Sequence, residues 1–149
     1  MRDVRKVKDT VTILEARSLL RSQTAQELEL ARAAEAERRG QADQARNALD
    51  AAFGAWSGYL AGSSLDPSRL GLLATAIDVR TGELRAREAA AKAASEAADV
   101  KQAEYATRNA EVAHAKTLHR RARREQTRAE EQASLDINDD RIAFQWSRK

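Results

Sequence analysis

The stretch GAWSGYLAGSSLDPSRLGLL, residues 54–73, differs from the sequence on either side because it holds four of the six glycines and the only proline. Within it, Asp66 is followed by Pro67. An aspartate at a helix N-cap accepts hydrogen bonds from the first free N–H groups, and proline suits the first helical position because it has no N–H. The stretch therefore predicts a turn at about residues 62–66, followed by a helix.

Two further features of this stretch support a turn between two helices. Leu65 and Leu70 have the spacing of a hydrophobic staple, in which residues on either side of the N-cap pack together. Gly62, Ser63 and Ser64 lack bulky side chains and predict the exit from the preceding helix. A connection this short places two helices side by side and antiparallel.

The sequence outside the turn is typical of long helices. Charged residues make up 33% of the 149 residues and aromatic residues only 4%. Disorder is the competing interpretation of so polar a composition. It is disfavoured because proline is nearly absent and because alanine and arginine are strong helix formers. The net charge of +3 is small beside 26 basic and 23 acidic residues, as on a solvated helix surface.

The composition also bears on the compartment. The sequence has no cysteine, which excludes disulfides and thiolate chemistry and fits a reducing environment. No run reaches the roughly 18 apolar residues of a membrane span. The basic stretch at residues 1–18 lacks the continuous apolar core of a secretory signal. We therefore predict a cytoplasmic protein.

Apolar and small residues recur at intervals of three and four along both halves of the chain, which is the spacing of a coiled-coil seam. In the first half the frame slips by one residue after Leu28, whereas the second half keeps one frame from Leu70 to Ala133. Long basic residues on this frame can lay their stems along the seam. The predicted apolar seam comprises Val4, Val7, Val11, Leu14, Ala25, Leu28, Ala31, Ala42, Ala45, Leu49, Ala52, Trp56 and Tyr59, and then Leu70, Leu73, Ile77, Leu84, Ala91, Ala94, Ala98, Tyr105, Val112, Ala115, Ala122, Ala129 and Ala133.

The sequence thus predicts an all-α fold, a long two-helix antiparallel coiled-coil hairpin that forms one domain over residues 1–149. Helix one is expected over about residues 3–61 and helix two over about residues 67–134. A C-terminal tail is expected over about residues 135–149.

Bulky apolar residues cluster on both sides of the turn, and two interpretations of the cluster stay open. It can form a small core that stabilises the hairpin, or part of it can be exposed as a docking surface. Gly54, Gly58 and Gly62 favour the second interpretation, because their spacing of four residues leaves one side of the helix bare. The cluster comprises Phe53, Trp56, Tyr59 and Leu60 before the turn, and Leu65, Leu70, Leu72, Leu73 and Ile77 after it.

The run KTLHRRARREQTR, residues 116–128, is the densest group of charges. Six basic residues lie in it beside one acidic residue, Glu125. It is interpreted as a solvated helix face, as a surface for acidic proteins, or as a nucleic-acid surface. Nucleic acid is disfavoured because no aromatic residues interleave with the arginines and no leucine zipper follows them.

The last segment, SLDINDDRIAFQWSRK, has an acidic patch followed by Ile142, Phe144 and Trp146. A fold at about residue 64 makes this segment extend past the N-terminus by about twenty residues. Its aromatic residues then have no neighbouring helix. Exposed aromatics are typical of contact sites, so Phe144 and Trp146 are candidate binding residues. Fraying and disorder are the other interpretation.

The sequence offers little to catalysis or to cofactor binding. His114 and His119 stand five residues apart, about 140° around a helix, which is a poor geometry for a shared metal. Asp136, Asn138 and Asp140 resemble the start of a calcium loop, but the required Gly is replaced by Arg141. No phosphate-binding glycine loop is present. We predict no cofactor, no metal, no small-molecule substrate and no enzymatic activity.

The layout resembles the FliJ/YscO stalk proteins of flagellar and virulence-type type III secretion systems. The resemblance rests on the hairpin architecture, on the row Leu73, Ile77, Arg80 and Leu84 in early helix two, and on the acidic, aromatic-containing segment at residues 128–146. It implies a cytoplasmic stalk, at the base of a secretion apparatus on the inner membrane, that supports protein export. The implied partners are the hexameric export ATPase, the cytosolic domain of the export gate and secretion chaperones.

The resemblance also suggests which residues make these contacts. The expected ATPase contact comprises Val4, Val7, Arg120, Arg121, Arg123 and Arg124. The expected core or export-gate contact near the tip comprises Phe53, Trp56, Leu73, Ile77 and Leu84. An unrelated coiled-coil adaptor or scaffold is the alternative function, and a nucleic-acid-binding hairpin is a further one.

Overall fold

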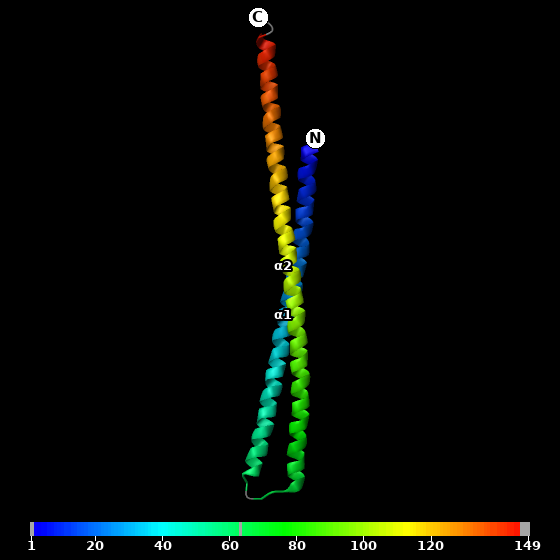
Figure 1. Cartoon of the computed structure of the whole chain (residues 1–149), viewed down its shortest axis with the longest axis vertical. Coiled ribbons are helices and arrows are strands. Elements are labelled where there is room, and N and C mark those ends of the chain that lie inside the picture. The colour runs from blue at the N-terminus through cyan, green and yellow to red at the C-terminus, as the bar shows by residue number, and fades with distance from the viewer. Residues whose placement is uncertain (1, 63, 147–149) are drawn as a thin grey trace. The chain divides into compact units, whose positions relative to one another are not determined.

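The computed structural model describes residues 2–62 and 64–146. They form two helices, α1 at Arg2–Leu60 with 59 residues and α2 at Pro67–Trp146 with 80 residues (Figure 1). The described residues include no strand. The two helices pack against each other, which confirms the predicted all-α, two-helix hairpin.

Polar contacts between the helices show that they run antiparallel. Lys101 Nζ lies 2.8 Å from Glu27 Oε2, and Arg46 Nη2 lies 2.8 Å from Glu88 Oε1. Residue numbers on α2 therefore fall as those on α1 rise, as a short turn requires.

The turn has the hydrogen bonds that its sequence predicts. The Ser68 N–H donates to Asp66 Oδ1 at 2.9 Å, and the Leu70 N–H donates to the Asp66 carbonyl at 3.0 Å. Asp66 is therefore the N-cap of α2, and Pro67 is its first residue. The Asp66 N–H donates in turn to the Tyr59 hydroxyl at 2.7 Å, which ties the start of α2 to the end of α1.

The sequence also predicts a hydrophobic staple and a helix exit at the turn. Leu65 is 57% exposed, and its staple with Leu70 stays a prediction. The Gly62 N–H donates to the Tyr59 carbonyl at 3.1 Å at the exit from α1. Ser63 lies outside the described residues.

The chain divides into two compact units. The turn unit comprises residues 25–103, and the terminal unit comprises residues 1–24 and 104–149. Each unit pairs a part of α1 with a part of α2. The prediction of a single domain over residues 1–149 stays a prediction.

The buried residues of both units fall on the predicted seam. Four of the six are alanines, and an alanine buries little apolar area. The packing energy of each layer is therefore small, and α1 and α2 depend on many such layers. The buried residues are Leu28, Ala42 and Ala98 in the turn unit and Val112, Ala115 and Ala122 in the terminal unit.

The end of α2 lies beyond the predicted one. The helix continues to Trp146, twelve residues past the expected end at residue 134, so the part of the predicted tail at residues 135–146 is helical. No glycine or proline interrupts this segment. Side chains four residues apart support it, because the Gln132 amide donates to Asp136 Oδ1 at 2.9 Å.

Two residues of the predicted seam, Ala129 and Ala133, are exposed because α1 does not reach them. Lys6 near the start of α1 pairs with Glu125, so α2 continues past the level of Arg2, the first described residue (Figure 1). Val4, near the same end of α1, is 44% exposed. In the terminal unit the seam therefore ends near residue 126.

Candidate functional site

The basic segment, residues 116–128, lies on α2 in the terminal unit. Arg120, Arg121, Arg123 and Arg124 are all exposed, whereas Ala122 between them is only 2% exposed and packs toward α1. At 100° per residue the four arginines spread over an arc of about 160° on the side away from Ala122. They therefore cover the outer half of the helix rather than one narrow stripe.

The charge of this segment is only partly neutralised. Glu125, its one acidic residue, pairs with Lys6 of α1. The hydrogen bond from Lys6 and its positive charge lower the pKa of the Glu125 carboxyl below its ordinary value, and the charges of Arg121 and Arg128 add to this effect. Within residues 2–62 and 64–146, no carboxylate lies within ion-pair distance of the four central guanidinium groups.

The start of α1 lies beside this segment, as the prediction of a shared contact requires. Thr10 Oγ1 lies 3.2 Å from His119 Nδ1, and Arg17 Nη1 donates to the Glu111 carbonyl at 3.2 Å. Val7 is half-buried, one turn before Thr10. The structure therefore brings the six predicted ATPase-contact residues into one part of the terminal unit. Whether they bind an ATPase stays a prediction.

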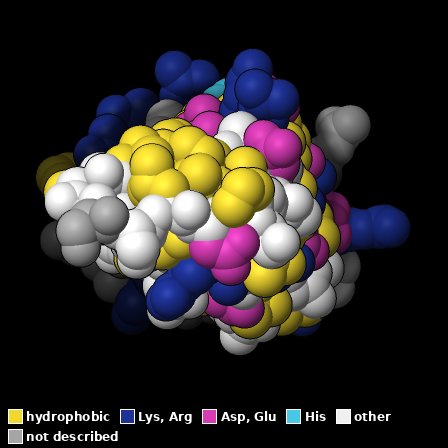
Figure 2. All heavy atoms as spheres, turned by 90° about the horizontal axis from the view of Figure 1, so that it is seen from below, with side chains coloured by type: hydrophobic (Ala, Val, Ile, Leu, Met, Phe, Trp, Pro, Cys, Tyr) yellow, Lys and Arg dark blue, Asp and Glu magenta, His cyan; other side chains and the backbone are white. Residues whose placement is uncertain are grey.

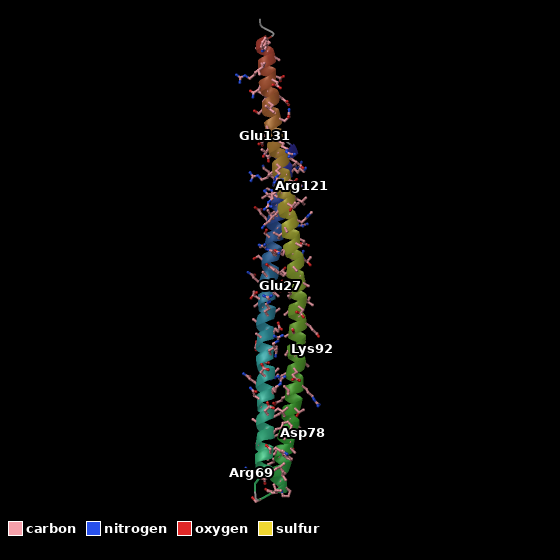
Figure 3. The ribbon with its side chains drawn as sticks, turned by 60° about the vertical axis from the view of Figure 1, so that its left-hand side comes forward. Glu27, Arg69, Asp78, Lys92, Arg121 and Glu131 are labelled. Carbon is pink, nitrogen blue, oxygen red and sulfur yellow. The ribbon has the colours of Figure 1, made fainter. Side chains whose placement is uncertain are left out.

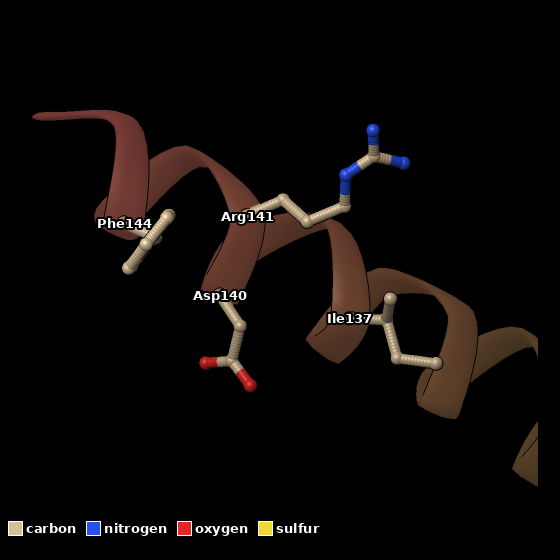
Figure 4. Close-up of a pocket in the computed structure, with 4 residues that line it drawn as sticks. All are labelled: Ile137, Asp140, Arg141 and Phe144. Atoms are coloured by element: carbon tan, nitrogen blue, oxygen red, sulfur yellow. The ribbon is translucent and has the colours of Figure 1, made fainter.

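The end of α2 carries exposed apolar side chains on two opposite faces. Leu135, Ile142 and Trp146 share one face because they are seven and four residues apart. Ile137 and Phe144 share the opposite face, and with Asp140 and Arg141 they line a shallow hollow (Figure 4). The five apolar residues are between 54% and 76% exposed. The predicted contact residues Phe144 and Trp146 therefore point to different sides of the helix.

The apolar cluster near the turn divides into a half-buried part and an exposed part. Trp56, Leu73 and Ile77 are half-buried on the seam, as is Leu84 two turns further on, so these residues act as core. Phe53 is 49% exposed. Hydrophobic side chains gather into a patch at the turn end, as Figure 2 shows. The exposed members of the cluster are Phe53, Leu60, Leu65 and Leu72.

Sequence reasoning missed an exposed apolar row on α2. Leu72 was assigned to the turn cluster, but it also begins a row that continues through Val79 to Val100. These three side chains are 73%, 53% and 58% exposed. The sequence does carry a signal for this row, because each of the three residues lies one residue before a position of the seam's frame. The row therefore has the same spacing as the seam.

No group of three or more His, Cys, Asp or Glu side chains is placed to hold a metal ion within the described residues. Neither α1 nor α2, as far as their residues are described, has a stretch long and apolar enough to cross a membrane.

Comparisons with known proteins give no relative. No protein family matches the chain, and no curated protein or solved structure matches it significantly.

Proposed function

We propose that this chain is a central-stalk component of a type III secretion apparatus, which binds the hexameric export ATPase through the basic segment. The observation that supports this proposal is the spread of exposed, un-neutralised arginines around the outer half of α2. Such a helix suits insertion into a ring, because a ring presents carboxylates from several directions at once.

The chemistry of arginine supports a protein partner of acidic character. A guanidinium group forms two parallel hydrogen bonds with one carboxylate, and such charge-assisted bonds are stronger than neutral ones. Four groups spread over about 160° meet carboxylates on more than one subunit of a surrounding ring. A flat partner surface would contact only part of this arc.

The other contacts of the proposed stalk are assigned to other surfaces. The exposed residues near the turn, among them Phe53, suit the export gate. The two apolar faces at the end of α2, with Phe144 and Trp146, suit a chaperone that clasps the helix from both sides. Under this proposal the chain lies on the cytoplasmic side of the inner membrane, at the base of the apparatus.

The test is the rate of ATP hydrolysis by the cognate export ATPase, with and without this protein. The variant changes Arg120, Arg121, Arg123 and Arg124 to Glu. We expect the wild-type protein to raise the rate or to stabilise the hexamer, and the variant to do neither. The effect of the wild-type protein is expected to fall as salt rises, because exposed charges are screened.

A matched control carries the same change in charge on the turn unit. It changes Arg38, Arg39, Arg85 and Lys92 to Glu, all of which are exposed. The control is expected to act like the wild type. If the wild type neither binds the ATPase nor changes its rate, the stalk function is wrong and the adaptor function replaces it. Steeply salt-dependent binding to DNA or RNA would instead favour the nucleic-acid function.

A further inference from the structure

The turn unit has a second row of apolar residues on α2, which α1 does not cover. Its members repeat at intervals of four and three, and each lies one residue before a position of the seam's frame, whether that position is apolar or basic. The row therefore lies about 100° around the helix from the seam. Only Glu83 interrupts it. The row comprises Leu72, Ala76, Val79, Ala86, Ala90, Ala93, Ala97 and Val100, and all of these except the half-buried Ala90 are exposed.

α1 contributes a row of both apolar and amide side chains to the same side of the turn unit. Gln41, Gln44 and Ala48, each one residue before a seam residue, line a shared hollow with Glu83 of α2, which shows that the two rows flank one side. The row on α1 also includes Leu30, which is 72% exposed. Gly58 lies on this row as well, one residue before Tyr59, and an added Cβ there would meet nothing within 4 Å, so the surface is open at this position. We call this side, formed by both rows, the apolar side.

The other side of the turn unit is charged. There Arg46 pairs with Glu88, and Asp43 lies beside them at 3.7 Å. Asp78 and Lys92 also lie on α2 (Figure 3). The row of α2 on this side is therefore mostly polar or charged, whereas the row of α2 on the apolar side is interrupted only by Glu83.

The row of the apolar side on α2 runs from Leu72 to Val100 and has its midpoint at residue 86. Bulky residues lie near both of its ends, Leu72 at one and Val100 at the other. Charged and amide groups lie between them, where Arg80 Nη1 contacts Glu83 Oε2 at 2.7 Å and Arg87 Nη1 donates to Gln41 Oε1 at 3.0 Å. A surface that matches itself in this way suits a two-fold interface, in which the same patch is used twice.

We propose that the apolar side binds the apolar side of a second copy of this chain, with the two α2 helices antiparallel about an axis near residue 85. This arrangement places Glu83 of each copy opposite Arg87 of the other. It places Val79 against the small residues around Ala91, and Leu72 near Ala97 and Val100. Charge and side-chain size are therefore complementary across the interface.

The size of the apolar side also suits a second copy. Its row on α2 extends from Leu72 to Val100, a rise of about 42 Å along the helix, and two helices side by side are about 20 Å wide. The face therefore measures about 800 Å², which is the area that each partner buries in a stable interface of standard size. The proposal goes beyond the stalk function and does not rest on it, since it uses only the turn unit.

The first test is the mass of the full chain in solution over a range of concentrations, by sedimentation or light scattering. We expect a species of twice the 16.4 kDa of one chain. The double variant Leu72→Glu and Val79→Glu is expected to raise the dimer dissociation constant about tenfold or more, because two charges would lose water at the interface. A wild-type chain that remains monomeric at every concentration overturns the proposal.

A matched control and a folding check keep this test interpretable. Ala36→Glu with Ser57→Glu adds the same charge to exposed positions of α1 away from the apolar side. This control is expected to dimerise like the wild type. Circular dichroism is expected to show equal helix content in all three proteins, since none of the four positions is buried. A dimer that the control weakens as much as the Leu72 and Val79 variant overturns the assigned surface.

The second test uses the absence of native cysteine. Near the axis, Ala86→Cys is expected to form a disulfide between copies, because the two positions approach each other closely. Leu72→Cys is expected to form none, because its two copies stand roughly 40 Å apart along an antiparallel pair. Rapid cross-linking of Leu72→Cys would mean that the helices are parallel. Cross-linking of neither variant would overturn the proposed axis.

Discussion

The turn unit and the terminal unit are built from the same two helices on the same seam, yet they differ in how their surface charges are paired. In the turn unit Glu27 pairs with Lys101 and Arg46 pairs with Glu88 across the helices, and apolar residues are exposed. In the terminal unit the apolar seam is well buried around Val112, and no carboxylate of the described residues lies within ion-pair distance of the exposed Arg120, Arg121, Arg123 and Arg124. The alanine-rich seam holds the two helices together but does not determine which residues their outer faces carry. The two units can therefore serve different functions.

The physical consequence is that the two units should respond to different conditions. Contacts made by an apolar side depend on the area removed from water and change little with salt. Contacts made by exposed arginines weaken as salt screens them. A salt series that weakened self-association and ATPase binding equally would contradict this comparison.

The largest expected effect comes from a charge placed in the terminal seam. Val112 is only 2% exposed, so Val112→Asp buries a carboxylate without a partner and is expected to cost about 3 kcal/mol or more. Urea unfolding followed by circular dichroism measures the loss. Ala98→Asp makes the same change in the turn unit, where Ala98 is 5% exposed. If the units unfold separately, each variant lowers the midpoint of only one transition.

The next effect comes from the turn. Asp66→Ala removes the side-chain acceptor for the Ser68 N–H and is expected to cost about 1 kcal/mol. The loss is expected in the turn unit alone. Hydrogen exchange at the first residues of α2 measures it, and Asp66→Asn is the control because asparagine also caps helices. Equal loss of protection around Val112 would show that the units unfold together.

A smaller effect, of opposite sign, is expected at two glycines of α1. An added Cβ meets nothing within 4 Å at Gly40 or at Gly54, and neither has a positive φ. Gly40→Ala and Gly54→Ala are therefore each expected to stabilise the turn unit by about 0.5–1 kcal/mol, because alanine loses less backbone entropy in a helix. Thermal unfolding measures the gain. A loss of stability at either position would reveal a contact that the hairpin alone does not have.

The smallest effect is a pH dependence in the terminal unit. The pKa of Glu125 is lowered by Lys6, so the pair contributes stability above the ordinary carboxyl pKa. This contribution is expected to disappear as pH falls below about 4.3 and through the lowered value. Glu125→Gln removes the pair, so the difference in melting temperature between the wild type and the variant should shrink as pH falls across that range. A variant that loses no stability at neutral pH would show that this exposed pair contributes nothing measurable.

Much of the fold was predictable because its signals are local. Asp66 and Pro67 mark the start of α2, and all six buried residues belong to the predicted seam. The end of α2 was not predictable in the same way, because the segment after residue 134 lacks a stop signal. A change of periodicity there was interpreted as the end of the helix, although a helix needs only backbone hydrogen bonds to continue.

The candidate sites were predictable only in part. The exposure of Arg120, Arg121, Arg123 and Arg124 follows from their place off the seam. The two-faced arrangement of Phe144 and Trp146 depended on knowing that this segment is helical. The apolar side was not predictable, because two rows with the same spacing adjoin on α2 and the spacing does not determine which of them α1 covers.

The sequence by itself determined the turn, the two helices and the residues able to form a seam, because N-caps, helix propensity and spacing act over a few residues. Only the tertiary structure decided which row of α2 is covered. Leu73 is half-buried and its neighbour Leu72 is 73% exposed, although both lie on rows with the same spacing. The physical reason is that one helix covers only one side of another, so the pairing with α1 determines which apolar row is left for a partner.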